Sequence, residues 1–95
     1  VGVTSNTVID SFATGAYRTA KYVISSKSDG GNQSVEVLLV HDGADSYITI
    51  YGSISTVSVD IVSLSSNIAA GVVKLYATTS QTNCTVNLIG TYVTD

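Results

Sequence analysis

Residues 17–51 read YRTAKYVISSKSDGGNQSVEVLLVHDGADSYITIY, with the pairs Asp29-Gly30 and Asp42-Gly43 between runs of alternating apolar residues. Asp-Gly is a preferred centre of the two-residue turns that join antiparallel strands. The stretch therefore predicts three antiparallel strands, at residues 17–26, 33–41 and 46–51. These three strands decide the fold class, because a sheet with one apolar face needs a second layer to cover it.

The two turns also predict the register of these strands. A turn centred on Asp29-Gly30 gives the facing pairs Ile24–Val35, Tyr22–Val37 and Ala20–Leu39. A turn centred on Asp42-Gly43 gives the pairs Leu39–Ser46, Val37–Ile48 and Val35–Ile50. A four-residue loop at residues 42–45 would leave the same side chains on the same face, and it stays open as an alternative. Both turns place Val35, Val37 and Leu39 on one apolar face, which a slip of one residue would scatter over both faces.

Four more strands are expected outside this stretch, at residues 7–12, 56–62, 72–78 and 83–94, with a break at Gly52-Ser53. β-Branched residues and tyrosine dominate, and helical periodicity is weak everywhere, with residues 66–70 as the one possible exception. Cys84 alternates in phase with Val86 and Leu88 and is expected in the core. Seven short strands in 95 residues predict a single domain, residues 1–95, folded as an all-β antiparallel β-sandwich.

The second face of the central strands is more apolar than a solvent-exposed face usually is. It is expected to carry Lys21, Val23, Glu36, Leu38, Val40, Tyr47, Thr49 and Tyr51. Either further strands cover both sides of this sheet, or the face is an interface with another subunit or domain. The residues expected nearest to such a contact are Leu38, Val40, Tyr47 and Tyr51.

Composition excludes several function classes. Four Lys or Arg against seven Asp or Glu give a net charge of −3, which disfavours the clustered cations of a nucleic-acid-binding surface. One Cys and one His exclude an intrachain disulfide, a cysteine-based zinc site and a two-histidine metal site. No apolar run approaches the about 18 residues of a membrane span. We expect no cofactor, no metal and no membrane partner.

The residues with catalytic chemistry are few and clustered in sequence. His41 is followed by Asp42, Asp45 and Ser46, which would place a Ser-His-Asp site within one hairpin, whereas such groups normally come from separate elements. The interpretation we adopt is a histidine at the end of a hairpin beside turn-forming aspartates, and the same aspartates are not taken as a calcium site.

Two further side-chain sets have a structural and a functional interpretation. Glu36 is expected to form a cross-strand ion pair with Lys21 and not to act as a catalytic acid or base. The chain is therefore predicted not to be an enzyme. Tyr47 and Tyr51 are interpreted as packing and interface residues, with sugar stacking as the alternative.

Six segments of the chain together resemble a known family. They are residues 9–12 (IDSF), 16–22 (AYRTAKY), 36–43 (EVLLVHDG), 47–52 (YITIYG), 71–75 (GVVKL) and the Val- and Thr-rich 86–94. This pattern resembles a small β-rich module of virion structural and tail-associated proteins of tailed phages, including T4-like phages and cyanophages. One departure is Ile50, where the family has Glu before Tyr-Gly.

The resemblance implies a non-enzymatic β-sandwich at the C-terminal end of a longer virion protein. A chain that begins at Val1 and contains no Met agrees with that expectation. The implied function is assembly in a phage tail, neck, fibre or capsid decoration, with copies of itself and other virion proteins as partners and a homo-oligomer as the expected state. The alternative is a module that binds surface glycans or a receptor on a fibre or capsid.

Overall fold

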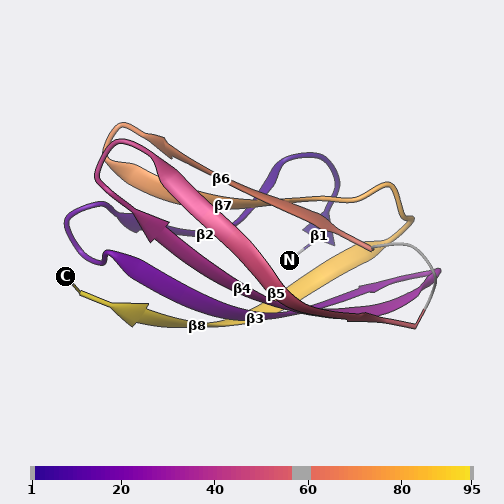
Figure 1. Ribbon diagram of the computed structural model, residues 1–95. Helices are drawn as coiled ribbons and strands as arrows, with labels where there is room; N and C mark the ends of the chain where they lie inside the picture. The colour runs from indigo at the N-terminus through magenta and orange to yellow at the C-terminus, as the bar shows by residue number, and fades with distance from the viewer. Residues whose placement is uncertain (1, 57–60, 95) are drawn as a thin grey trace.

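A computed structural model of the chain describes residues 2–56 and 61–94 and consists of two antiparallel sheets packed face to face (Figure 1). The larger sheet has the strand order β1-β8-β3-β4-β5 and the smaller sheet β2-β7-β6. The predicted all-β sandwich is confirmed. The strands are β1 (Gly2–Val3), β2 (Thr7–Ala13), β3 (Thr19–Ser28), β4 (Gly31–His41), β5 (Ser46–Ser55), β6 (Ser63–Ala69), β7 (Val72–Thr78) and β8 (Cys84–Val93).

The first predicted hairpin is confirmed in register. Ser28 pairs with Gly31 across a two-residue turn, and the three expected pairs Ile24–Val35, Tyr22–Val37 and Ala20–Leu39 all form. Every residue of these pairs is buried. The turn chemistry and the apolar alternation therefore specify the same register, as the sequence indicates.

The second hairpin forms with the four-residue loop that the sequence left open as an alternative, and the pairs expected from a two-residue turn, Leu39–Ser46, Val37–Ile48 and Val35–Ile50, are wrong. Leu39 pairs with Ile48 and Val37 with Ile50, because the loop takes the longer form, residues 42–45. Asp42 explains the difference, since its Oδ1 accepts hydrogen bonds from the backbone N–H groups of Ala44 and Asp45 at 2.9 and 2.8 Å. These bonds close a four-residue loop, and the parity of the two strands is unchanged.

Strand β5 continues through Gly52 instead of breaking there. Val37 pairs with Ile50 and Glu36 with Gly52, so Tyr51 is an extra residue in β5 and forms a β-bulge. Beyond the bulge, Ile54 pairs with Ser34 and lies on the outer face, where it is 78% exposed.

The strand predicted at residues 56–62 does not form at residues 56, 61 and 62. The other four residues, 57–60, lie outside the described part of the chain. Thr56, Ile61 and Val62 belong to no strand. Strand β6 follows from Ser63 and includes residues 66–69, which belong to the one stretch that the sequence left open as a possible helix. The backbone N–H groups of Ile61 and Val62 both donate to Oε1 of the buried Gln33, at 2.8 and 3.0 Å. These two apolar residues are buried in the core instead of pairing in a sheet.

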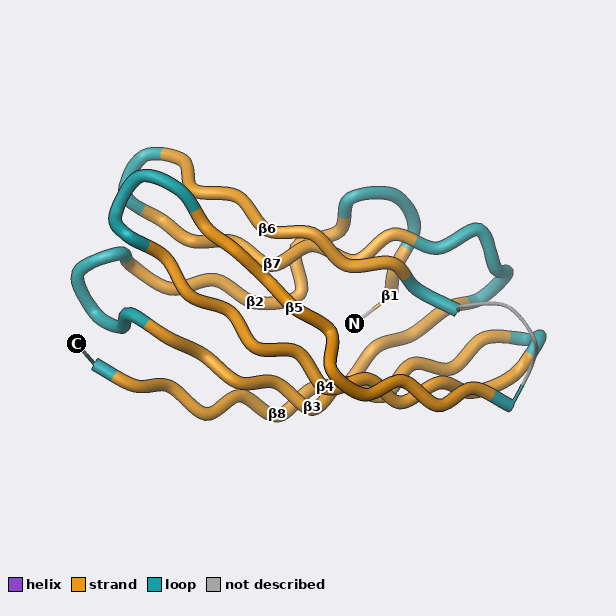
Figure 2. The backbone as a smooth tube through the Cα atoms, viewed as in Figure 1, coloured by secondary structure: helices purple, strands orange, loops and turns teal. Residues whose placement is uncertain are grey.

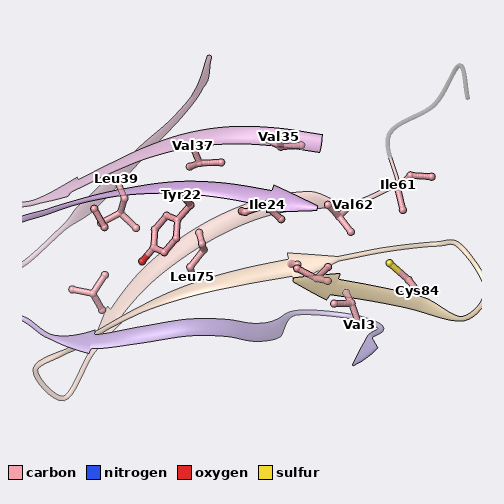
Figure 3. Close-up of a cluster of buried hydrophobic side chains, with 14 residues drawn as sticks. Val3, Tyr22, Ile24, Val35, Val37, Leu39, Ile61, Val62, Leu75 and Cys84 are labelled. Carbon is pink, nitrogen blue, oxygen red and sulfur yellow. The ribbon is translucent and has the colours of Figure 1, made fainter. Parts of the chain in front are cut away.

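The core lies between the two sheets. Figure 3 shows Tyr22, Ile24, Val35, Val37 and Leu39 of the larger sheet on the side that faces Leu75 of β7. Cys84 is buried in the same cluster, as expected. In the tube view the smaller sheet lies on one side of the larger sheet only (Figure 2). The described residues therefore cover one face of the larger sheet and leave its outer face uncovered.

Candidate interaction surface

The outer face of the larger sheet carries the four residues that the sequence marks as contact candidates. Leu38 and Val40 of β4 are each 43% exposed, and Tyr47 and Tyr51 of β5 are 58% and 48% exposed. Val40 faces Tyr47 in the ladder, so the structure brings candidates from two strands side by side. Of the two interpretations of this face, coverage by further strands of the described chain is wrong.

Strand β8 extends this apolar face, and the sequence does not predict that it does. Ile89 is 73% exposed and faces Val23, which is 43% exposed, while Val93 is 55% exposed. Alternation predicts the side on which a residue lies, but nothing in the local sequence says that residues 83–94 pair with residues 17–26. We call the combined surface the outer patch; it consists of Val23, Leu38, Val40, Tyr47, Tyr51, Ile89 and Val93.

The charged residues of this face are few, and their expected ion pair does not form. Glu36 faces Val23, and Lys21 faces Leu38. Lys21 Nζ lies 5.8 Å from the centre of the Tyr51 ring, a cation–π contact that reaches across β4. Because the ammonium occupies one side of that ring, Tyr51 is a poorer platform for sugar stacking than its sequence position suggests.

The outer face of the smaller sheet is mostly polar, in contrast to the outer patch, with Val8 as its exposed apolar residue. It presents Ser11, Ser65, Asn67, Lys74 and Tyr76. A hollow of about 390 Å³ on this side is lined by Asn6, Ser65, Ser66, Asn67 and Tyr76. The two sheets therefore differ in chemistry on the sides that face away from the core.

The His41 hairpin does not form a catalytic arrangement. His41 is buried, its Nδ1 accepts a hydrogen bond from the Gly43 N–H at 3.0 Å, and its Nε2 lies 2.6 Å from the carbonyl oxygen of Tyr17. Since Nδ1 accepts, the neutral ring carries its proton on Nε2 and donates it to Tyr17. Ser46 Oγ bonds to Ser66 Oγ at 2.7 Å, and Asp42 bonds to its own loop.

A partly buried polar cluster lies between the sheets. In β2, Val8 faces Tyr76 and Asp10 faces Leu75, so Ile9 is an extra residue and the bulge turns Asp10 inward. Asp10 Oδ2 accepts hydrogen bonds from the hydroxyls of Tyr22 at 2.8 Å and Tyr92 at 2.5 Å. Phe12 and Tyr17 pack around Tyr92, with ring centres 5.8 and 4.9 Å away.

This cluster shifts the acidity of both tyrosines. Burial, together with the hydrogen bond to Asp10, holds the pKa of Tyr22 above its ordinary range and raises the pKa of Tyr92 to about 12. Both shifts favour the neutral phenol, which can donate to the carboxylate. Arg18 donates from Nη1 to the carbonyl oxygen of His41 at 3.2 Å.

Neither a metal-binding cluster nor a membrane-spanning helix is found in the described ranges, 2–56 and 61–94. No three His, Cys, Asp or Glu side chains there lie together in a way that could hold a metal ion. No helix there is long and apolar enough to cross a membrane. No protein-family model matches the sequence, and no curated protein matches it. The candidate site therefore rests on its own geometry.

Proposed function

We propose that this chain is a non-enzymatic assembly module that binds copies of itself and other structural proteins through the outer patch. The observation that carries the proposal is the set of exposed apolar side chains on one face of the larger sheet, spread over β8, β3, β4 and β5. The location in a phage virion is part of the same proposal and is supported only by the sequence resemblance. Tail, neck, fibre and capsid decoration all fit such a module.

The size of the outer patch supports a protein partner. An aromatic side chain buries about 150–250 Å². With the low end of this range for the five aliphatic residues, the exposed fractions of the seven residues correspond to roughly 600 Å². The largest apolar patch on a typical monomer covers about 300–600 Å² and is often functional. One partner in a standard interface buries about 800 Å². The outer patch with its polar rim therefore approaches the area that one side of a stable interface needs.

The chemistry of the two outer faces supports the same partner class. Charged residues are depleted at the centres of protein interfaces, whereas tyrosines are enriched there. The outer patch contains two tyrosines, and of the described charged residues only Lys21 and Glu36 lie between its members. The smaller sheet, by contrast, presents serine, asparagine and lysine to solvent. Association is therefore expected through the larger sheet.

Sedimentation of the isolated chain over a concentration series tests this proposal. Leu38→Lys places a charge in the middle of the outer patch and is expected to weaken association by about tenfold or more, since 1.4 kcal/mol corresponds to a factor of ten. The matched control is Asn67→Lys on the exposed face of the smaller sheet, which is expected to leave association unchanged. A wild-type chain that stays monomeric at every concentration would overturn the proposal.

Glycan binding is a second candidate, favoured by the hollow at Tyr76 more than by Tyr47 and Tyr51. Ser65, Asn67 and the Tyr76 ring offer hydroxyl, amide and aromatic groups to a neutral hydroxylated ligand. Screening the chain and a Tyr76→Ala variant against an array of immobilised glycans tests it. Glycan binding that the variant lacks would support this function, and an array without any binding would remove it.

A further inference from the structure

Strand β8 is an edge strand along most of its length. One side pairs with β3 from Thr85 to Val93, while the other side pairs with β1 only at Cys84 and Thr85. Within the described residues, no other strand pairs with β8. In Figure 1 the C-terminal part of β8 forms the border of the larger sheet. Such a border presents backbone donors and acceptors that a further strand can use.

The hydrogen-bond pattern identifies which backbone groups of β8 face the open edge. The His41 N–H donates to the Arg18 carbonyl at 3.2 Å. Because pairing groups alternate along an antiparallel strand, even-numbered residues of β3 point to β4 and odd-numbered ones to β8. The β3–β8 register then directs odd-numbered residues of β8 toward β3. The N–H and C=O groups of Leu88, Gly90 and Tyr92 therefore face the open edge.

The other long edges carry features that hinder the addition of a strand. Strand β5 has its bulge at Tyr51, and β2 has its bulge at Ile9. In β6 the side chain of Asn67 accepts the hydrogen bond of the Ile68 N–H at 2.8 Å, so that donor is already used. Natural edge strands avoid pairing through such bulges and through charged residues or proline.

Strand β8 has none of these protections. Its sequence, CTVNLIGTYV, contains no charged residue and no proline, and its register with β3 is regular. Ile89 and Val93 on this strand are also among the most exposed apolar side chains. A long, regular, uncharged edge with exposed apolar side chains is a site at which a further strand adds.

We propose that β8 pairs antiparallel with β8 of a second copy, about a two-fold axis at Gly90. This inference rests on the proposed function and names its first partner. An axis at Gly90 pairs Leu88 with the partner's Tyr92 and places Ile89 beside the partner's Thr91. A strand without charges meets no like-charge repulsion from its own copy, even though the chain carries a net charge of −3. A two-fold arrangement is also the commonest symmetry of homo-oligomers.

The pairing has a consequence for the outer patch. A two-fold axis perpendicular to the sheet keeps the outer faces of both copies on the same side. The two outer patches then join along β8, where Ile89 and Val93 lie. The pair would present about twice the apolar area of one chain to the next structural protein.

Amide hydrogen exchange of the wild-type chain tests the pairing directly. The amides of Leu88, Gly90 and Tyr92 are expected to exchange at least about tenfold more slowly at a concentration where the chain is associated than at high dilution. The internal control is the β5 edge. The Thr56 N–H donates to the Asn32 carbonyl, so the even-numbered residues of β4 point to β5. Their partners before the bulge are Tyr47 and Thr49, and the amides of Ile48 and Ile50 therefore point outward. These two amides are expected to show no dependence on concentration.

A pair of proline variants gives a second test. Leu88→Pro removes a donor at the β8 edge without removing a bond to β3, and Ile50→Pro does the same at the β5 edge. We expect only Leu88→Pro to weaken association, with circular dichroism showing that both variants retain the sheet fold. Association with unprotected Leu88, Gly90 and Tyr92 amides would overturn the pairing and leave the outer patch as the interface. A chain that never associates would overturn both proposals.

Discussion

At the scale of single residues, Asp10 shows how one extra residue changes the interior. Regular alternation puts Val8, Asp10 and Phe12 on the same side of their strand. The bulge at Ile9 separates them, so Val8 lies outside while Asp10 and Phe12 lie between the sheets. Gly90 leaves room for the two tyrosines that bond to Asp10, because a Cβ at this position would come within 2.6 Å of the Tyr92 hydroxyl and 3.2 Å of the Tyr22 ring.

The raised phenol pKa values predict a loss of stability at high pH. Above pH 10.0, the ordinary pKa of tyrosine, the unfolded chain releases its phenol protons, while the folded protein keeps the Tyr92 proton up to about 12. The unfolded state then binds fewer protons, so stability falls as the pH rises through this window. Tyr22 contributes in the same direction. We expect Tyr92 to account for about 1 kcal/mol, after discounting for its partial exposure.

Urea unfolding measured at several pH values between neutral and strongly alkaline checks this expectation. Tyr92→Phe should be less stable at neutral pH, because a hydrogen bond to a carboxylate is lost, and should show a shallower decline at high pH. Tyr47→Phe, changed on the outer face, should follow the wild-type curve. An equal decline for wild type and Tyr92→Phe would show that the Asp10 cluster does not hold the tyrosine proton.

At the scale of elements, the loop between β4 and β5 depends on one carboxylate. The backbone N–H groups of Asp45 and Ala44 hold the pKa of Asp42 below its ordinary value of 3.8. A lowered carboxyl pKa contributes stability above the ordinary value, and that contribution is lost as the pH falls through the folded-state pKa.

Replacement of this carboxylate is therefore expected to matter in a pH-dependent way. Asp42→Ala should lower the thermal midpoint at neutral pH, and the gap to wild type should close in strong acid, where the wild-type carboxyl is also protonated. The control is Asp45→Ala, which keeps the backbone N–H that Asp42 bonds. A gap that persists unchanged in acid would mean that the charge of Asp42 does not stabilise the loop.

The two hairpins also show what could be predicted from the sequence. The first was predicted in register because the two-residue turn that Asp29-Gly30 favours is the turn that forms, with Val35, Val37 and Leu39 buried. The second was not, since a two-residue turn and a four-residue loop bury the same face. Side-chain capping by Asp42 decides between them, and alternation carries no information about it.

The remaining errors have a similar origin. Ile61 and Val62 belong to a β-rich stretch, yet a single long-range contact with Gln33 places them in a connection. For the candidate site, the sequence identified Leu38, Val40, Tyr47 and Tyr51 by parity. It missed Ile89 and Val93 because strand order is set by the packing of the whole chain.

At the scale of the whole molecule, the sandwich has one polar and one apolar outer face. We expect an apolar fluorescent dye such as anilinonaphthalene sulfonate to bind the chain at high dilution and to be displaced only at concentrations where a further chain covers the outer patch, because pairing through β8 alone leaves this patch exposed. Fluorescence titration checks this, with Leu38→Lys as a variant that keeps the dye bound to higher concentration. Dye binding that does not depend on chain concentration would count against association through this face.

The bulge at Tyr51 has a consequence for the size of any assembly built by adding strands. A fibril grows because every added molecule brings a second open edge strand, with which a strand of the next molecule can pair. In this sandwich the regular edge lies at β8, and the opposite border of the same sheet is interrupted one residue before Gly52. Pairing through β8 occupies the open border of each molecule. The long borders that remain are those of β5 and β2, which have bulges, and that of β6, where Asn67 already accepts the Ile68 N–H. Growth by strand addition would thus end at two chains. The extra residue in β5 would prevent the stacking of further strands that builds an amyloid fibril.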